Sequence, residues 1–431
     1  CSRKPEVAEN RVRQWVAFAT IAFSRLNECS SDVPQNVASA AVRYAFPPLI
    51  AICLLGCDAR IERFEPNEVY SLTMARSRSA AAEIASEDAA DVVEELYGTP
   101  DDPKWPLPTS AGGVKPQNLL RAAGSVSSEK DGTHLGLFRE HCVTCHGLSG
   151  SGTGPASVFQ NPYPRDFRHG VFKWKSTDRG SKPTKADIRK LLLDGIPGTA
   201  MPSFALLSPD DLDALVDYVI YLASRGEVER RLTSAAIDEL DYDESRPETE
   251  LVLSSSDATE GGEVVAEVVS RVASDWAESE AKAATSEMPV LSGEALNESV
   301  DRGRDIFHGK IANCVGCHGP AGNGNVPTLD YDDWTKEYST KIGLTPSDRE
   351  AMRPFREAGA LRPRPIQPRN LQDGVFRGGG DAASLYQRIS QGIAGTPMPA
   401  VEITDQPTGT GLSQDQAWDL IRYVQSLSKS Q

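Results

Sequence analysis

Two copies of one short motif constrain this chain more than any other feature. Each copy has two cysteines separated by two residues and a histidine directly after the second: Cys142, Cys145 and His146, then Cys314, Cys317 and His318. This is the attachment pattern for c-type haem, in which each thiol adds to a vinyl group and the adjoining imidazole becomes the proximal iron ligand. The motifs therefore predict two covalently bound haem c groups. A redox dithiol or a four-cysteine zinc site would also use paired cysteines, but neither requires the histidines.

Two of the five methionines occupy equivalent positions after the motifs. Met201 follows Gly-Ile-Pro-Gly-Thr-Ala and Met398 follows Gly-Ile-Ala-Gly-Thr-Pro, and each precedes a proline. We predict that they are the sixth iron ligands, since a thioether favours ferrous iron and closes the iron to other ligands. Met288 and Met352 are alternatives for the second iron. His141 or His169 is the alternative where a methionine ligand is missing.

The chain contains an internal repeat that extends beyond these residues. The segment from Gln367 to Phe376 resembles the one from Tyr163 to Phe172, and each is followed by its methionine and a closing helix with the same apolar spacing. A glycine-rich segment follows His146, and we expect it to let the backbone pass close to the haem edge. The repeat places haem domains at about 113–230 and 299–431. An insertion at about 325–365 lengthens the second.

These motifs resemble those of the class I cytochrome c family, twice in tandem, over about 250 residues. The resemblance implies an all-α fold in which N- and C-terminal helices cross beside the haem, with Tyr218 and Tyr423 as the aromatic residues at the crossing. It also implies thioether bonds at the four motif cysteines, proximal ligation by the two motif histidines, and sixth ligation by Met201 and Met398. Both motif sets resemble haem subunits of terminal oxidases and of periplasmic dehydrogenases.

The segments outside the repeat have a different composition. Residues 58–112 read equally well as a partly ordered stalk or as an N-terminal helix packed on the first haem domain. Residues 226–298 contain 19 acidic and five basic residues, most of the formal charge of −16. We predict an acidic, partly helical linker over 231–298, with a helix from Glu263 to Ala281 because valines and Trp276 recur every four residues.

The N-terminal region has the features of an export signal. Arg43 precedes the apolar run 45–55, and the run ends in Leu-Leu-Gly before Cys57. This resembles a bacterial lipoprotein signal, which would make Cys57 the lipidated first residue and residues 1–41 upstream sequence. An ordinary buried apolar segment is the alternative. With lipidation, residues 1–57 predict a chain anchored at the periplasmic side of a bacterial membrane.

Charge suggests the partners. The net charge disfavours nucleic acid. Residues 165–190 contain nine basic and three acidic residues. Residues 352–377 contain six basic and two acidic residues. We expect Arg165 and Arg369, each after a proline at equivalent repeat positions, to pair with haem propionates. The other basic residues are expected to steer an acidic redox partner.

The favoured function is a dihaem cytochrome that transfers single electrons between respiratory redox proteins, alone or as a subunit of a complex. Two alternatives stay open. A dihaem peroxidase would be an enzyme with one open or releasable sixth site. An interaction or redox-sensing module would bind partners through the acidic segment while the haem reports redox state.

Overall fold

The computed structural model describes residues 63–75, 81–242, 250–253, 259–283, 287–327, 330–405 and 409–428. The export signal and Cys57 lie outside these residues. The chain divides into two units, residues 1–57 and residues 58–431, and all described residues belong to the second. Within the described residues, none of the helices is both long enough and apolar enough to cross a membrane.

The regular secondary structure of the described part is helical apart from three isolated β-bridges and a two-stranded antiparallel hairpin, β1 (Ser127–Ser128) and β2 (His134–Leu135). The α-helices are α2 Glu68–Ala75, α3 Ala81–Tyr97, α4 Pro116–Ala122, α5 Leu137–His141, α6 Val143–His146, α7 Lys185–Asp194, α8 Pro209–Asp238, α9 Glu260–Ala277, α10 Gly293–His308, α11 Cys314–His318, α12 Asp333–Glu337, α13 Arg353–Glu357, α14 Ala382–Gln391 and α15 Gln414–Leu427. The short 3₁₀ helices are η2 Ser157–Phe159, η3 Phe167–His169, η4 Glu280–Lys282, η5 Thr340–Ile342 and η6 Leu371–Asp373. The predicted all-α class is confirmed.

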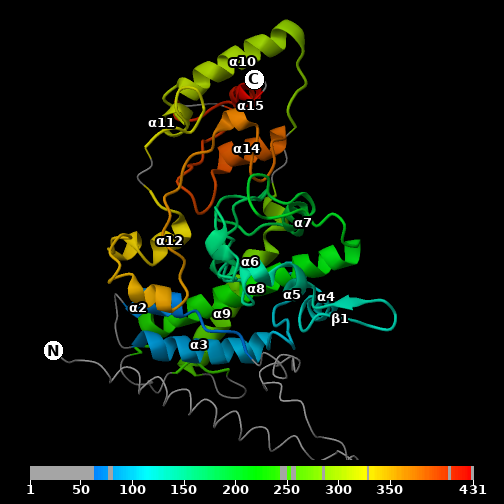
Figure 1. The fold of residues 1–431 in the computed structure, drawn as a ribbon, viewed down its shortest axis with the longest axis vertical. Coiled ribbons are helices and arrows are strands. Elements are labelled where there is room, and N and C mark those ends of the chain that lie inside the picture. The colour runs from blue at the N-terminus through cyan, green and yellow to red at the C-terminus, as the bar shows by residue number, and fades with distance from the viewer. Residues whose placement is uncertain are drawn as a thin grey trace, which may run out of the picture. The chain divides into compact units, whose positions relative to one another are not determined.

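The long helix α8 is the centre of the first domain (Figure 1). It begins as its sequence predicts, because Ser208 accepts a hydrogen bond from the Asp211 amide and Pro209 occupies the first turn. Its apolar residues are fully buried over several turns, including Leu215, Ile220 and Leu222. It continues to Asp238, past the position near 230 where we predicted the domain to end.

Segments on both sides of the repeat pack on α8. Helix α3 packs against α8, and its residues Ala85, Ala89 and Val93 are all buried. For residues 81–97 the structure therefore shows a helix packed on the first domain, which was one of the two alternatives for 58–112. The predicted linker helix is α9, capped by Thr259 and packed on α8 through Val272 and Trp276. Both segments therefore enlarge the core of the first domain.

The two domains differ in the helix that precedes the motif. In the second domain α10 crosses α15, with Gly303 at the contact and the rings of Phe307 and Tyr423 centred 5.3 Å apart. In the first domain the rings of Phe138 and Tyr218 form the matching pair at 5.0 Å. However, α5 has only five residues, because the β-hairpin and Gly136 in the left-handed conformation precede it. The helix expected to run into the first motif is thus much shorter than its counterpart.

The insertion at 325–365 forms a small core of its own. Tyr338, Leu344, Met352 and Phe355 are buried together, and Val69 and Leu72 of α2 pack against them. The insertion is therefore attached to an element of the first domain, although it belongs to the second in sequence.

Candidate haem sites

One cavity of about 790 Å³ receives the predicted ligands of both domains. Its lining includes all eight residues predicted to bind the haems: Cys142, Cys145, His146 and Met201 from the first domain, and Cys314, Cys317, His318 and Met398 from the second. The alternative ligand Met352 packs in the core of the insertion, and Met288 packs against the core beneath α15. The size and apolar lining are those of a cofactor site.

The two motif histidines are oriented in the same way. The Nδ1–H of His146 donates to the carbonyl of Arg165 at 3.0 Å, and that of His318 donates to the carbonyl of Arg369 at 3.1 Å. A carbonyl can only accept, so each ring carries its proton on Nδ1 and keeps the Nε2 lone pair for a metal. Burial lowers the pKa of both imidazoles, which keeps them neutral and able to bind iron.

The motif cysteines do not have the chemistry of a redox dithiol. Burial raises the pKa of the Cys142 thiol to about 12 and that of Cys314 to about 11. A reactive dithiol needs a lowered pKa, so this environment does not support disulfide exchange. Among the described residues no three His, Cys, Asp or Glu side chains gather closely enough to hold a metal ion, so the four cysteines do not form one zinc site.

The two methionines end turns of identical construction. In the first, the Ile196 amide donates to the Met201 carbonyl at 3.1 Å, and the Met201 amide donates to Thr199 Oγ1 at 3.1 Å. In the second, the same bonds join Ile393 to Met398 and Met398 to Thr396, each at 3.2 Å. The repeat therefore preserves the local geometry that holds each methionine at the cavity.

Glycines after both motifs allow a close backbone contact within the chain. A Cβ at Gly152 would lie 2.7 Å from the carbonyl oxygen of Pro164, and one at Gly324 would lie 2.5 Å from that of Pro368. Both glycines also have positive φ. The two glycines thus let the chain after each motif lie against Pro164 or Pro368. The residues that follow these prolines, Arg165 and Arg369, supply the carbonyls that bind the histidines. They position the proximal ligand through this backbone contact.

The side chains of Arg165 and Arg369 both reach the cavity. The Arg165 guanidinium lies over the ring of Trp334, with Cζ 3.2 Å from the ring centre, and its two Nη atoms are buried without a hydrogen-bond partner in the described part of the chain. The Nε atom of Arg369 is also buried and has no hydrogen-bond partner among the described residues. Buried, unpartnered guanidinium nitrogens beside a cofactor cavity fit a carboxylate-bearing group such as haem.

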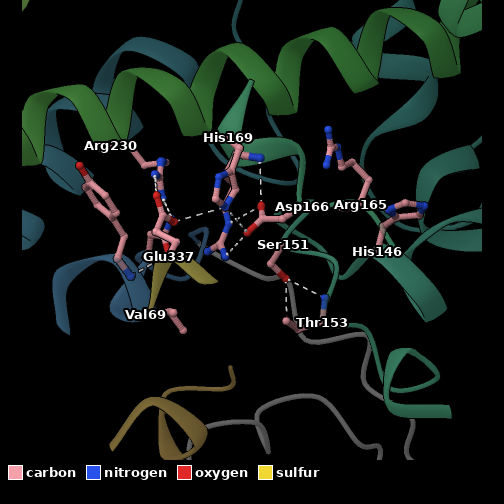
Figure 2. Close-up of polar contacts among 12 residues, drawn as sticks. Val69, His146, Ser151, Thr153, Arg165, Asp166, His169, Arg230 and Glu337 are labelled. Carbon is pink, nitrogen blue, oxygen red and sulfur yellow. Dashed lines mark hydrogen bonds and ion pairs between the residues drawn. The ribbon is translucent and has the colours of Figure 1, made fainter. Parts of the chain in front are cut away.

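His169 faces a polar network instead of the cavity. Figure 2 shows it between Asp166 and Glu337, with Nε2 3.7 Å and 3.6 Å from their carboxylates. Glu337 in turn binds Arg230 of α8 at 2.5 Å. His169 is thus placed to join the insertion to the first domain. His141, the other alternative ligand, does line the cavity.

Most cations of the two basic segments are bound within the protein. Lys173 pairs with Asp332 at 3.3 Å, and Lys182 with Glu227 at 2.6 Å. Arg364 donates to the carbonyls of Val158 and Gln160. Arg179 donates to the carbonyls of Met398 at 2.8 Å and Thr396 at 3.0 Å. The Lys182 pair lies within the first domain, whereas the other three side chains hold the two domains and the insertion together. Fewer of these cations are therefore left for a partner.

Sequence reasoning missed several residues of the site. Trp334 lies in the insertion, which has no counterpart in the first domain, and Arg179 and Arg377 reach across to the opposite domain. The repeat gives no signal for such contacts. The carbonyl role of Arg165 and Arg369 could have been predicted from their equivalent third positions in the repeated segments 163–172 and 367–376.

Comparison with protein-family models agrees with this geometry. Residues 133–219 match the model described as cytochrome c oxidase, cbb3-type, subunit III, and residues 300–428 match the model described as cytochrome c. The chain belongs to the cytochrome c family, with two class I domains in tandem. Cytochrome c domains imply covalently bound haem c and haem-based electron transfer.

Other comparisons add little. No curated protein matches. Among solved structures, a chain of the reducing HAO-like protein complex of Kuenenia stuttgartiensis is 23% identical, with a TM-score of 0.40 over 70% of this chain and 99% of that one.

Proposed function

We propose that this cytochrome holds two haems and passes single electrons between respiratory redox proteins at the periplasmic side of a bacterial membrane. The observation that supports it is that each domain directs an Nδ1-protonated histidine and a turn-held methionine into one cavity. A haem with these two ligands supplies one-electron ferric–ferrous chemistry. Lipidation of Cys57 would anchor the chain, and the protein would act alone or as a subunit of a complex.

The protein's own contribution is to fix the ligands and exclude water. The carbonyls of Arg165 and Arg369 set the tautomer and orientation of the two histidines. The turns ending at Met201 and Met398 hold each thioether by backbone bonds, so a change of iron charge requires little rearrangement of the chain. A site that moves little on reduction suits an electron carrier.

A redox titration followed by optical absorption tests the proposal. We expect two one-electron waves from low-spin haems. Replacing the methionine in M201A or M398A should lower one potential, on the order of 0.1 V, and open one iron, since axial ligands tune haem potentials over about 0.8 V. A protein without haem absorption would contradict the proposal. One high-spin haem in the wild type together with peroxide turnover would favour the peroxidase.

Location and partner need their own test. C57A should release the full chain from the membrane to the soluble periplasmic fraction while both haem spectra stay unchanged. Persistent membrane association of this variant would contradict the lipid anchor. Electron transfer to an acidic redox protein should slow with added salt, because screening weakens steering.

A further inference from the structure

Five cations line the cavity where the two domains meet, and one of them is Lys310. We call the other four the junction cluster: Arg165, Lys173, Arg369 and Arg377. Their proximity also affects their pKa values. Burial is the main cause that lowers the pKa of Arg377, and the charge of Arg369 lowers it further. Burial likewise lowers the pKa of Lys173, and the charges of Arg165 and Arg377 lower it further. The charge of Asp332 has the opposite effect on this pKa but is outweighed. The members therefore lie close enough to repel one another.

The cluster is short of anions. Within the described residues, one ion pair links it to a carboxylate, between Lys173 and Asp332 at 3.3 Å. Both Nη atoms of Arg165 and the Nε atoms of Arg369 and Arg377 are buried with no hydrogen-bond partner there. Asp332 also acts on Arg165 and Arg377 through its charge, while Asp166 and Asp333 pair with other cations. Partly buried cations that outnumber their counter-charges are unfavourable, so carboxylates from another source would stabilise this arrangement.

The arginines of the cluster cross between the domains. Arg165, from the first domain, has Nη1 3.4 Å from the position of a Cβ at Gly395, in the methionine turn of the second domain. Arg369, from the second domain, has Nη2 3.1 Å from the corresponding position at Gly198, in the turn of the first. Arg377 also approaches the Gly198 carbonyl, at 3.5 Å. Each of the three thus lies beside the ligand turn of the opposite domain.

We propose that the junction cluster is one carboxylate-binding site, shared by both domains, that neutralises the propionates of both haems. This differs from the pairing expected from sequence, in which Arg165 serves the first haem and Arg369 the second. The chemistry supports it, because guanidinium groups bind carboxylates in a fork geometry, and haems held by the ligands that line this cavity would bring carboxylates to it. The proposal rests on the proposed function, since it requires both haems.

Redox titration of R165Q and R369Q tests the shared site. A lost cation leaves carboxylate charge uncompensated, which favours ferric iron, so each variant should lower both potentials. R165K and R369K retain the charge and should restore most of the shift. The shift should persist at high salt, because a buried pair is weakly screened. M201A and M398A assign each potential to its domain.

R364Q is the matched control. Arg364 also bridges the domains, through the carbonyls of Val158 and Gln160, but it is not part of the cavity lining. Its loss should leave both potentials unchanged. If R165Q and R369Q each moved only the potential of their own domain, or moved neither, the shared site would be refuted. Equal shifts in R364Q would refute it as well, since loosening of the domain contact would then explain them. Two intact haem spectra in the variants separate this failure from a failure of the proposed function, in which haem itself would be missing.

Discussion

The two haem domains share their ligand geometry but differ in what encloses it. In the first, Cys142 and His146 are buried, and α3, α4 and α9 pack around α8 to form a large core. In the second, His318 is half-buried and Cys317 is exposed. Its core is a smaller group around Phe307, Trp418 and Leu420. The same motif thus occurs in a well-enclosed site and in an open one.

The open site is completed by the first domain. Arg179 holds the carbonyls of Met398 and Thr396, whereas the corresponding arginine contact in the first domain, Arg377 to Gly198, is at the limit of a hydrogen bond at 3.5 Å. The ring of Trp174, from the first domain, packs closely on Gly378 of the second. A Cβ at Gly378 would lie 2.8 Å from Trp174 Cδ2. The comparison suggests that the first domain is stable by its own core and that the second depends on the first.

The largest expected effect comes from removing one buried tryptophan in each domain. Trp276 and Trp418 are each 1% exposed, so W276A and W418A should each cost about 3–5 kcal/mol of unfolding free energy. If the second domain depends on the first, W276A lowers the unfolding temperature of both domains and W418A that of the second alone. Scanning calorimetry, with haem absorbance assigning each transition, measures this. An unchanged second transition in W276A would show that the domains are independent.

A smaller effect is expected where the helices of the second domain cross. A Cβ at Gly303 would lie 2.0 Å from the carbonyl oxygen of Asp419 on α15, so G303A should force α10 and α15 apart. We expect a loss of about 1–3 kcal/mol, which exceeds the gain in helix propensity from alanine of about 1 kcal/mol. Chemical denaturation followed at the second haem measures it.

Two further glycines control that experiment. In the first domain, a Cβ at Gly226 of α8 would lie 2.5 Å from Arg168 Cα, so G226A should destabilise the first domain by a similar mechanism. Gly180 has open space around it, and G180A should be neutral. Equal stability of G303A and G180A would mean that the helix crossing tolerates the extra methyl group.

Local features of this cytochrome could be predicted from sequence because they depend on residues close together in the chain. The haem motifs, the Ser208 cap of α8 and the repeated methionine turns are of this kind. The short α5 was missed because the hairpin before it is set by Gly136 and by strand pairing that the apolar pattern does not reveal. The basic segments suggested a docking face, yet their partners are distant carboxylates and carbonyls that only the fold brings near.

The polar network that joins the insertion to the first domain, formed by His169, Glu337 and Arg230, is sensitive to pH. Burial, together with the charge of Arg230, lowers the pKa of His169 to about 4, so the folded protein keeps it neutral while the unfolded chain protonates it near pH 6.5. Although burial alone would raise the pKa of Glu337, the charge of Arg230 lowers it overall. In both cases the unfolded state binds more protons as the pH falls, so acid reduces stability.

We therefore expect the unfolding free energy to fall between pH 7 and pH 5, with His169 contributing on the order of 1 kcal/mol. H169Q removes this contribution, so its stability should decline less steeply over that range, as measured by urea denaturation at several pH values. E337Q loses its ion pair with Arg230 and should be less stable at pH 7, but it should keep the dependence on His169. Parallel pH curves for the wild type and H169Q would show that His169 does not titrate with unfolding.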